Sequence, residues 1–143
     1  MFHVDVITPE AKIFSADADS VSLPTIMGEI TILQHHVPLV TTLAPGMLTV
    51  RRGKEENYFA LSRGVVEIEG NTIRVLSDIA DRVDTIDEQA VVEAKKRAEN
   101  LLKEKRTDTE AFTEASALLD REIARLRAVR RRRSEGRRIP RSS

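Results

Sequence analysis

The sequence predicts an α+β protein with a mainly β N-terminal half, in which an antiparallel β-sandwich or flattened barrel precedes an antiparallel hairpin of two helices. Apolar residues alternate with polar ones over short runs in residues 2–76, but recur every three or four positions after residue 85. The first period is that of half-buried strands and the second that of amphipathic helices. We therefore expect a sandwich domain over residues 1–84, a mobile helical hairpin over 85–133 and a disordered basic tail over 134–143.

Short alternating runs fill the first half of the chain. Phe2, Val4 and Val6 alternate with polar residues, and similar runs recur at 21–23, 48–50, 66–68 and 73–75. Proline and glycine interrupt these runs, which is typical of a sandwich or barrel built from many short strands. Gly70 and Asn71 accept the positive φ of a tight turn, so the run around them predicts a β-hairpin.

Two capping signatures mark the predicted helices. Thr85 with Glu88, and Thr107 with Glu110, each resemble a capping box. An apolar stripe follows each signature: Ala90, Val91, Ala94, Ala98, Leu101 and Leu102 in the first helix, and Phe112, Ala115, Leu119, Ile123 and Leu126 in the second. An isolated two-helix hairpin is only marginally stable, so this one must pack on the sandwich, on another protein or on a ligand. An element of this kind is suited to act as a conformational switch.

The formal net charge of zero conceals a strong asymmetry. Residues 1–120 carry 13 Lys and Arg against 21 Asp and Glu, a net charge of −8, whereas residues 121–143 carry 10 Arg against 2 Glu, a net charge of +8. A basic end of this kind suggests contact with an acidic surface. The chain has no Cys, no signal-peptide pattern and no apolar run of about 18 residues, so we expect neither thiol chemistry nor a transmembrane helix.

No motif for catalysis or metal binding stands out. The sequence shows no nucleophile–base pattern and no phosphate-binding loop, which predicts a protein that is not an enzyme. His35 and His36 are neighbours that would point to opposite faces of a strand, so no metal site is expected. The arginines at 130–133 could bind phosphates, but no aromatic side chains interleave with them for stacking on bases.

The stretch at residues 28–45 contains, in order, Gly28, Glu29, Ile30, Ile32, Leu33, His36, Val37, Pro38 and Leu39. This pattern resembles a motif of the epsilon subunit of F-type ATP synthases. The chain departs from the family pattern at Thr31, Gln34 and His35. Further matches occur in order at 45–47, 61–68 and 80–82, so the resemblance covers about residues 2–130. It implies the same arrangement of a sandwich followed by a helical hairpin.

The resemblance implies a non-catalytic rotor subunit of the central stalk, peripheral to the cytoplasmic face of a bacterial cell membrane. Such a subunit couples ion flow through the c ring to ATP synthesis in the catalytic head. Its sandwich would contact the gamma subunit and the c-subunit ring, with Glu29 and His36 at that interface. Its hairpin would extend to the alpha and beta subunits and inhibit ATP hydrolysis. The arginines implied to pair with beta-subunit carboxylates are Arg121, Arg125, Arg127 and Arg130.

Some members of this family bind ATP on the folded hairpin. The positions that match their contacts are Asp81, Ile86, Asp87, Arg97, Arg121 and Arg125. Ala90 stands where the family motif has an arginine, and losing one charge-assisted contact weakens binding roughly tenfold to a hundredfold. We therefore expect no cofactor, and the departure at Ala90 argues against ATP as a regulatory ligand.

Two other functions stay open from the sequence alone. One is a nucleic-acid-binding adaptor that uses the C-terminal arginine cluster, and the other is an independent regulator whose hairpin clamps a nucleotide. The rotor hypothesis itself includes no nucleic-acid partner and no membrane contact except through the complex. It also predicts that the arginines beyond Val129 strengthen inhibition, because added positive charge pairs with more acidic surface.

Overall fold

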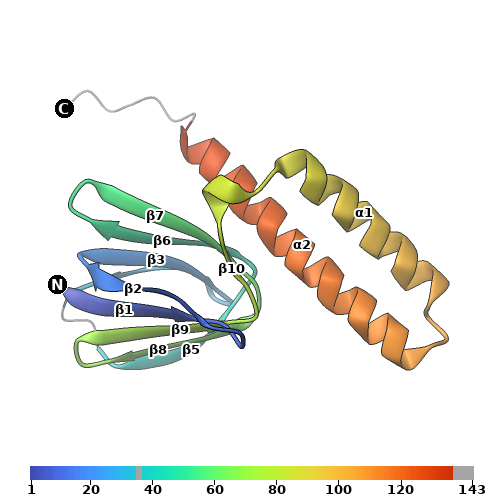
Figure 1. Cartoon of the computed structure of the whole chain (residues 1–143). Coiled ribbons are helices and arrows are strands. Elements are labelled where there is room, and N and C mark those ends of the chain that lie inside the picture. The colour runs from blue at the N-terminus through green and yellow to red at the C-terminus, as the bar shows by residue number, and fades with distance from the viewer. Residues whose placement is uncertain (35–36, 137–143) are drawn as a thin grey trace.

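The computed structural model describes residues 1–34 and 37–136. This part of the chain forms ten strands, a short 3₁₀ turn and two helices (Figure 1). The strands are β1 (Phe2–Ile7), β2 (Lys12–Ala18), β3 (Ser20–Thr25), β4 (Gly28–Leu33), β5 (Leu39–Leu43), β6 (Gly46–Arg52), β7 (Glu55–Leu61), β8 (Gly64–Glu69), β9 (Thr72–Ser77) and β10 (Ala80–Arg82). The 3₁₀ turn η1 (Val83–Thr85) leads into the helices α1 (Glu88–Glu104) and α2 (Thr109–Gly136).

The strands form one continuous sheet that curls into two layers, as the sequence predicts. Their order is β10-β7-β6-β3-β5-β8-β9-β1-β2, with β4 paired to β3. The described pairs are antiparallel apart from β1 and β9, which run parallel. A parallel pair needs a long crossover connection, and here most of the sandwich lies between β1 and β9 in the sequence. The predicted hairpin turn joins β8 to β9, and Gly70 has a φ of 58°.

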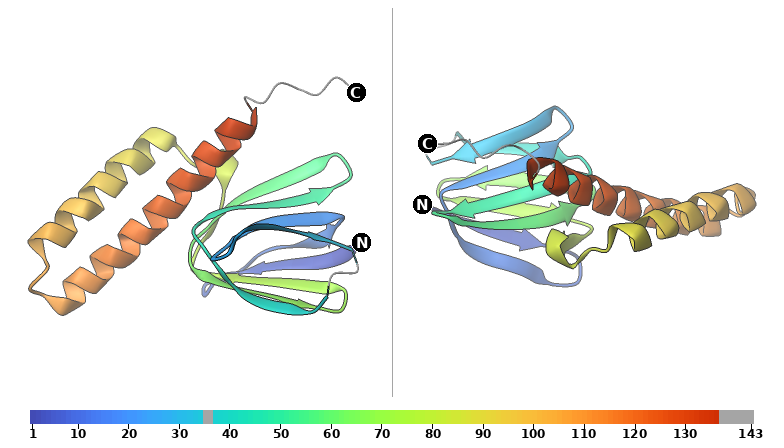
Figure 2. Two further views of the ribbon diagram at one scale, coloured as in Figure 1. Left: turned by 180° about the vertical axis from the view of Figure 1, so that it is seen from behind. Right: turned by 90° about the horizontal axis from the view of Figure 1, so that it is seen from above.

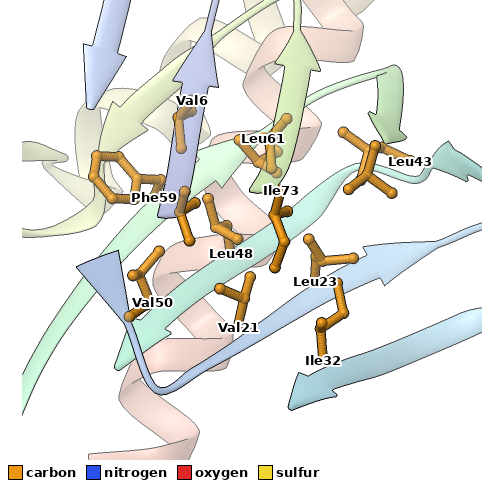
Figure 3. Packing of buried hydrophobic residues seen from close by; sticks show 14 of the residues in the cluster. Val6, Val21, Leu23, Ile32, Leu43, Leu48, Val50, Phe59, Leu61 and Ile73 are labelled. Atoms are coloured by element: carbon orange, nitrogen blue, oxygen red, sulfur yellow. The ribbon is translucent and has the colours of Figure 1, made fainter. Parts of the chain in front are cut away.

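The core lies between the two layers (Figure 3). Alternate residues of β1, which are Phe2, Val4 and Val6, point into it, as their period-two pattern requires. The strands β6 and β7 depart from this alternation, because five consecutive residues of β6 and the last four of β7 are buried. One face of this pair closes the core, and α2 packs beside the same two strands.

Both helices begin slightly later than their capping signatures predict. The Asp87 carboxylate accepts a hydrogen bond from the backbone N–H of Gln89 over 3.0 Å and so caps α1. The Thr85 hydroxyl instead donates to the backbone carbonyl of Arg82 over 2.8 Å. In the same way, Asp108 accepts from the backbone N–H of Ala111 over 3.2 Å at the start of α2. The predicted capping roles of Thr85 and Thr107 are therefore wrong.

The two helices form the predicted antiparallel hairpin, which leans on the sandwich through α2 (Figure 2). The C-terminal part of α2 lies beside β6 and β7, while α1 and the N-terminal part of α2 project away from the sandwich. Phe112 and Leu101, expected in the apolar stripes, are accordingly 40% and 38% exposed. Residues 134–136, expected in a disordered tail, continue α2, and the rest of that tail lies outside the described residues. No helix in residues 1–34 and 37–136 combines the length and the low polarity needed to cross a membrane.

Candidate functional site

The candidate site is the interface between α2 and the sandwich, which we call the docking interface. Its apolar centre contains Ala128 of α2, which is fully buried against Met47 of β6 and Tyr58 and Ala60 of β7. Val83 of η1 is buried in the same cluster. Ile86 and, from α2, Val129 pack partly buried against the same cluster. The helix thus contributes the small side chains of Ala128 and Val129, while the larger buried side chains, Met47 and Tyr58, come from the sandwich.

Arg125 connects α2 to the end of the sandwich. Its Nε donates a hydrogen bond to Oδ2 of Asp81 on β10 over 2.6 Å, and an NH1 nitrogen donates to Oε1 of Glu122 over 2.6 Å. Burial alone lowers the pKa of Arg125, but the hydrogen bonds and charges of Asp81 and Glu122 outweigh it and raise the pKa above its ordinary value. Arg125 is therefore a permanent cation that already holds two carboxylates within this chain.

The last turns of α2 add further polar contacts. Nη2 of Arg131 lies 3.2 Å from a carboxylate oxygen of Glu29 on β4. Nη1 of Arg133 lies 2.7 Å from a carboxylate oxygen of Glu88, the first residue of α1. The guanidinium group of Arg132 lies over the ring of Tyr58, 4.3 Å from its centroid, which is a cation–π contact. The C-terminal part of α2 thus contacts both the sandwich and the start of α1.

The four arginines predicted to make inhibitory contacts differ in their surroundings. Arg125 is half-buried in the pair with Asp81, whereas Arg127 and Arg130 are exposed. Arg127 donates only a 3.5 Å hydrogen bond to the backbone carbonyl of Pro45, and Arg130 lies 3.5 Å from Glu88. The Nε of Arg121 is buried and has no hydrogen-bond partner among the described residues. The structure therefore places these arginines along α2 but does not gather them at one site.

The two residues predicted at a rotor interface are Glu29 and His36. Glu29 lies at the start of β4 with its side chain 48% exposed, in the ion pair with Arg131. His36 lies outside the described residues. Exposed apolar side chains surround Glu29 in the sequence, since Ile26 is 65% exposed and Met27 is 86% exposed. This end of the β3–β4 hairpin therefore offers an apolar surface with one carboxylate.

A pocket of about 460 Å³ lies between α1, α2 and the chain that leads into α1. It brings together five of the six residues predicted for ATP, while the sixth, Arg121, does not line it. The lining residues are Asp81, Thr85, Ile86, Asp87, Ala90, Val91, Ala94, Arg97, Glu122 and Arg125. Three carboxylates and two guanidinium groups line this pocket, and two of those carboxylates already hold Arg125. A triphosphate needs an excess of positive charge, so this lining does not fit it well.

The sequence did not single out Glu88, Arg131, Arg132 and Arg133 as members of a common site. The helical period carried a usable signal, because Arg131 follows the buried Ala124 and Ala128 at positions i+7 and i+3 on the same face of α2. Within the described residues, no group of three His, Asp or Glu side chains is arranged to hold a metal ion.

Comparisons with known proteins match both parts of the chain. The family description "ATP synthase, Delta/Epsilon chain, beta-sandwich domain" fits residues 1–83, and "ATP synthase, Delta/Epsilon chain, long alpha-helix domain" fits residues 84–130. The chain is 37% identical over 130 residues to the ATP synthase epsilon chain of Nitrosococcus oceani, covering 90% of this chain and 92% of that relative. It is 42% identical over 129 residues to the ATP synthase epsilon chain of Laribacter hongkongensis, covering 89% and 91% of the two chains.

Two solved structures share the fold. A chain of the Euglena gracilis mitochondrial ATP synthase is 20% identical, with a TM-score of 0.67 over 86% of this chain and 76% of that one. A chain of the Tetrahymena thermophila mitochondrial ATP synthase central stalk and c ring is 19% identical, with a TM-score of 0.50 over 62% and 68%. At these identities the likeness concerns the arrangement of the sandwich and helices alone.

Proposed function

The chain belongs to the ATP synthase delta/epsilon chain family, and from this premise we propose that it is the non-catalytic epsilon-type subunit of the rotor. In this role its sandwich binds the gamma subunit and the c-subunit ring, and couples ion flow to ATP synthesis in the catalytic head. Its hairpin leaves the docking interface, reaches the alpha and beta subunits and inhibits ATP hydrolysis. The subunit is peripheral, and the complex holds it at the cytoplasmic face of a bacterial membrane.

The observation that carries this proposal is that the sandwich and the helical hairpin both match the delta/epsilon chain family, in the same order along the chain. The two family descriptions together cover residues 1–130, and the relatives are matched over about nine-tenths of their own length. A chain that had kept only the sandwich as a general scaffold would not match the helical half as well. The full-length match therefore supports a role that uses both parts.

The sandwich has the properties of a part that transmits torque. Its core is continuous from Val4 on β1 to Leu48 on β6 and Val75 on β9, all of them fully buried. Close packing of this kind resists deformation. On the surface, the neighbours Ile26 and Met27 in the β3–β4 turn are 65% and 86% exposed, and adjoining exposed apolar side chains favour a docking surface for another protein. Leu33, at the other end of β4, and Val40 on β5 are also exposed. Glu29 lies within this stretch and is the charged residue that we assign to the rotor interface.

The hairpin has the properties of a part that can be released. Its helix α2 contributes only Ala128 and the partly buried Val129 to the apolar cluster shared with the sandwich, and its ion pairs are partly exposed to water. Pairs of this kind contribute little each, so the docked and released states differ by a modest free energy. On release, Arg125 would lose Asp81 and be free to form a bidentate pair with a beta-subunit carboxylate.

The alternative of a nucleic-acid adaptor is not favoured. Three of the four arginines at 130–133 lie close to carboxylates of this chain, which compete with phosphates for them. The alternative of an independent nucleotide clamp conflicts with the carboxylate-rich lining of the pocket between the helices. No described feature favours either function over a rotor subunit.

Co-assembly with purified alpha, beta and gamma subunits tests the proposal. The full chain should elute together with the gamma-containing complex in size-exclusion chromatography. A Met27→Asp, Val40→Asp variant should bind more weakly, because two charges enter the exposed apolar surface of the sandwich. Val92→Asp, on an exposed position of α1, is the matched control and should bind like the wild type. Elution of the wild-type chain apart from an intact gamma complex would rule the rotor role out.

A further inference from the structure

The polar contacts of the docking interface come almost entirely from arginines of one helix segment. Arg125, Arg131, Arg132 and Arg133 all lie in the C-terminal half of α2. Their partners come from four separate places in the chain, which are Asp81 of β10, Glu29 of β4, Tyr58 of β7 and Glu88 of α1. The three partners on the sandwich, Asp81, Glu29 and Tyr58, determine the position and the rotation of α2 on it. Glu88 instead joins the end of α2 to the start of α1.

These contacts support one another beyond their single pairs. One oxygen of Glu88 accepts a 2.7 Å hydrogen bond from Arg133, and the other lies 3.5 Å from Arg130, an ion pair without a hydrogen bond. One carboxylate thus faces two arginines of α2 at the start of α1. Arg131 lies 3.4 Å from Glu135 as well as 3.2 Å from Glu29, and this second pair along the helix orients its guanidinium group. An oriented side chain loses less conformational entropy when it binds, so the network is stronger than the same pairs in isolation.

The other contacts of the docking interface make the arginine network important for holding the hairpin on the sandwich. To the apolar centre α2 contributes only Ala128 and the partly buried Val129, and the pocket between α1 and α2 has a lining that does not fit a polyphosphate. A bound nucleotide is therefore poorly suited to hold this hairpin down. At the position where an anionic ligand would be attractive to Arg125, the chain supplies its own carboxylates, Asp81 and Glu122.

We propose that Arg125, Arg131, Arg132 and Arg133 form an arginine latch that holds the hairpin on the sandwich without any small ligand. The latch rests on the proposed function in one respect, which is that the released hairpin inhibits ATP hydrolysis. Docking of the hairpin on the sandwich can be measured on the isolated chain. Because the same positive segment would face acidic surfaces after release, an acidic protein surface and the carboxylates at Glu29 and Glu88 compete for it.

The latch predicts the opposite effect on inhibition for substitutions of the arginines beyond Val129. Charge alone predicts that the arginines beyond Val129 strengthen inhibition. In the structure those arginines stabilise the docked, non-inhibitory arrangement instead. Neutralising Glu29 or Glu88 separates the two effects, because it removes a partner of the latch and leaves every arginine in place.

A distance measurement on the isolated full chain tests the latch. The chain has no Cys, so spin labels can be attached at Lys54→Cys in the β6–β7 turn and Lys105→Cys at the end of α1, both exposed. Electron–electron double resonance then reports the fractions of docked and released hairpin. Glu29→Gln removes a partner on the sandwich and should shift this equilibrium toward release by about two- to fivefold. Adding Glu88→Gln frees the end of α2 from the start of α1 and should raise the shift to roughly tenfold. Addition of ATP should leave the fractions unchanged.

Matched variants separate the latch from general effects of charge. Glu10→Gln on the sandwich and Glu114→Gln on α2 remove exposed carboxylates outside the latch and should leave docking unchanged. Glu29→Arg combined with Arg131→Glu should restore the docking that either change alone weakens. Raising the salt concentration should release the wild-type hairpin more than the Glu29→Gln, Glu88→Gln variant.

Two results would overturn the latch. One is wild-type docking in the Glu29→Gln, Glu88→Gln variant at low salt, and the other is failure of the reversed pair to restore docking. Neither result bears on the rotor role, which is tested by co-assembly with gamma. Conversely, a chain that does not bind gamma could still have a latched hairpin, so the two proposals fail separately.

Discussion

Arg125 Nε on α2 donates a 2.6 Å hydrogen bond to Asp81 Oδ2 on β10, which joins residues 44 positions apart. Asp81 belongs to the last strand of the sandwich, and Arg125 lies in the helix that packs beside β6 and β7. The pair therefore links the two parts of the chain directly. Because Arg125 also holds Glu122 of its own helix, its guanidinium group is fixed before it meets Asp81.

A double-mutant cycle should detect this link. Asp81→Asn, Arg125→Gln and the combined variant should give a coupling free energy of about 1 kcal/mol, since both side chains are partly exposed and water screens the pair. Urea unfolding measured by circular dichroism provides the free energies of unfolding. Asp84→Asn, at a nearby exposed position, is the control and should show no coupling with Arg125→Gln. Zero coupling at Asp81 would mean that the contact does not stabilise the docked hairpin.

The stability of the sandwich should depend on the ionisation of Asp5 on β1. The hydrogen bond from the Ser15 hydroxyl lowers the pKa of Asp5 below its ordinary value, burial opposes this shift, and the charges of Lys12 and His3 add to it. A carboxylate whose pKa is lower in the folded state stabilises the fold above its unfolded pKa, near 4. That contribution is lost as the pH falls through the lower folded value.

The pH dependence can be read from two variants. Asp5→Asn should be less stable than the wild type at neutral pH, and the difference should shrink toward zero as the pH falls below about 4. Ser15→Ala should reduce the same pH dependence, because it removes the largest cause of the lowered pKa of Asp5. Free energies of unfolding from urea titrations across the acid range provide the comparison. A constant difference between wild type and Asp5→Asn over that range would contradict this account.

Gly64 at the start of β8 should tolerate no side chain. A Cβ atom there would overlap the backbone carbonyl oxygen of Leu76 on β9, a neighbour in the ladder that cannot rotate away. Gly64→Ala should lower the free energy of unfolding by about 1–3 kcal/mol or more, since the strands must separate locally. Gly53→Ala is the control, because a Cβ at Gly53 meets open space and only its φ of 60° opposes the change. Equal effects of the two substitutions would show that the close approach of β8 and β9 is not decisive.

The pocket between α1 and α2 should not bind ATP at micromolar concentrations. Its lining holds three carboxylates against two arginines, and Ala90 supplies no further cation. Calorimetric titration of the full chain should therefore show no saturable heat. The combined variant Asp81→Asn, Glu122→Gln removes two of the carboxylates and should bind ATP more tightly than the wild type. Tight binding by the wild-type chain would refute this assessment of the pocket.

Much of the sandwich could be predicted from the sequence, because one buried face imposes a period of two on each strand. The alternation of Phe2, Val4 and Val6 corresponds directly to burial in β1. The parallel pairing of β1 with β9 could not be predicted, since strand alternation carries no information on the direction of a neighbour. The burial of Met47 on β6 also depends on α2, whose Ala128 covers the face that a lone sandwich would leave to water.

The helix ends were predicted less well, for a local reason. Thr85 and Asp87 can both cap a helix, and the choice between them depends on the turn η1, where Thr85 is held by the carbonyl of Arg82. At the other end, the sequence predicted a disordered tail from residue 134, because that segment has few apolar groups to bury. In the structure α2 continues to Gly136, and Glu135 pairs with Arg131 one turn earlier over 3.4 Å.

The central claim is that the hairpin of a rotor subunit inhibits ATP hydrolysis when it leaves the sandwich. Steady-state hydrolysis by the alpha–beta–gamma head tests it most directly, with the full chain compared with a chain ending at Ile86. The buried core of the sandwich lies wholly within residues 2–80, so the shorter chain retains it. We predict that both chains bind gamma, that the full chain lowers the rate, and that the shorter chain does not. Equal rates with both chains bound would contradict the account.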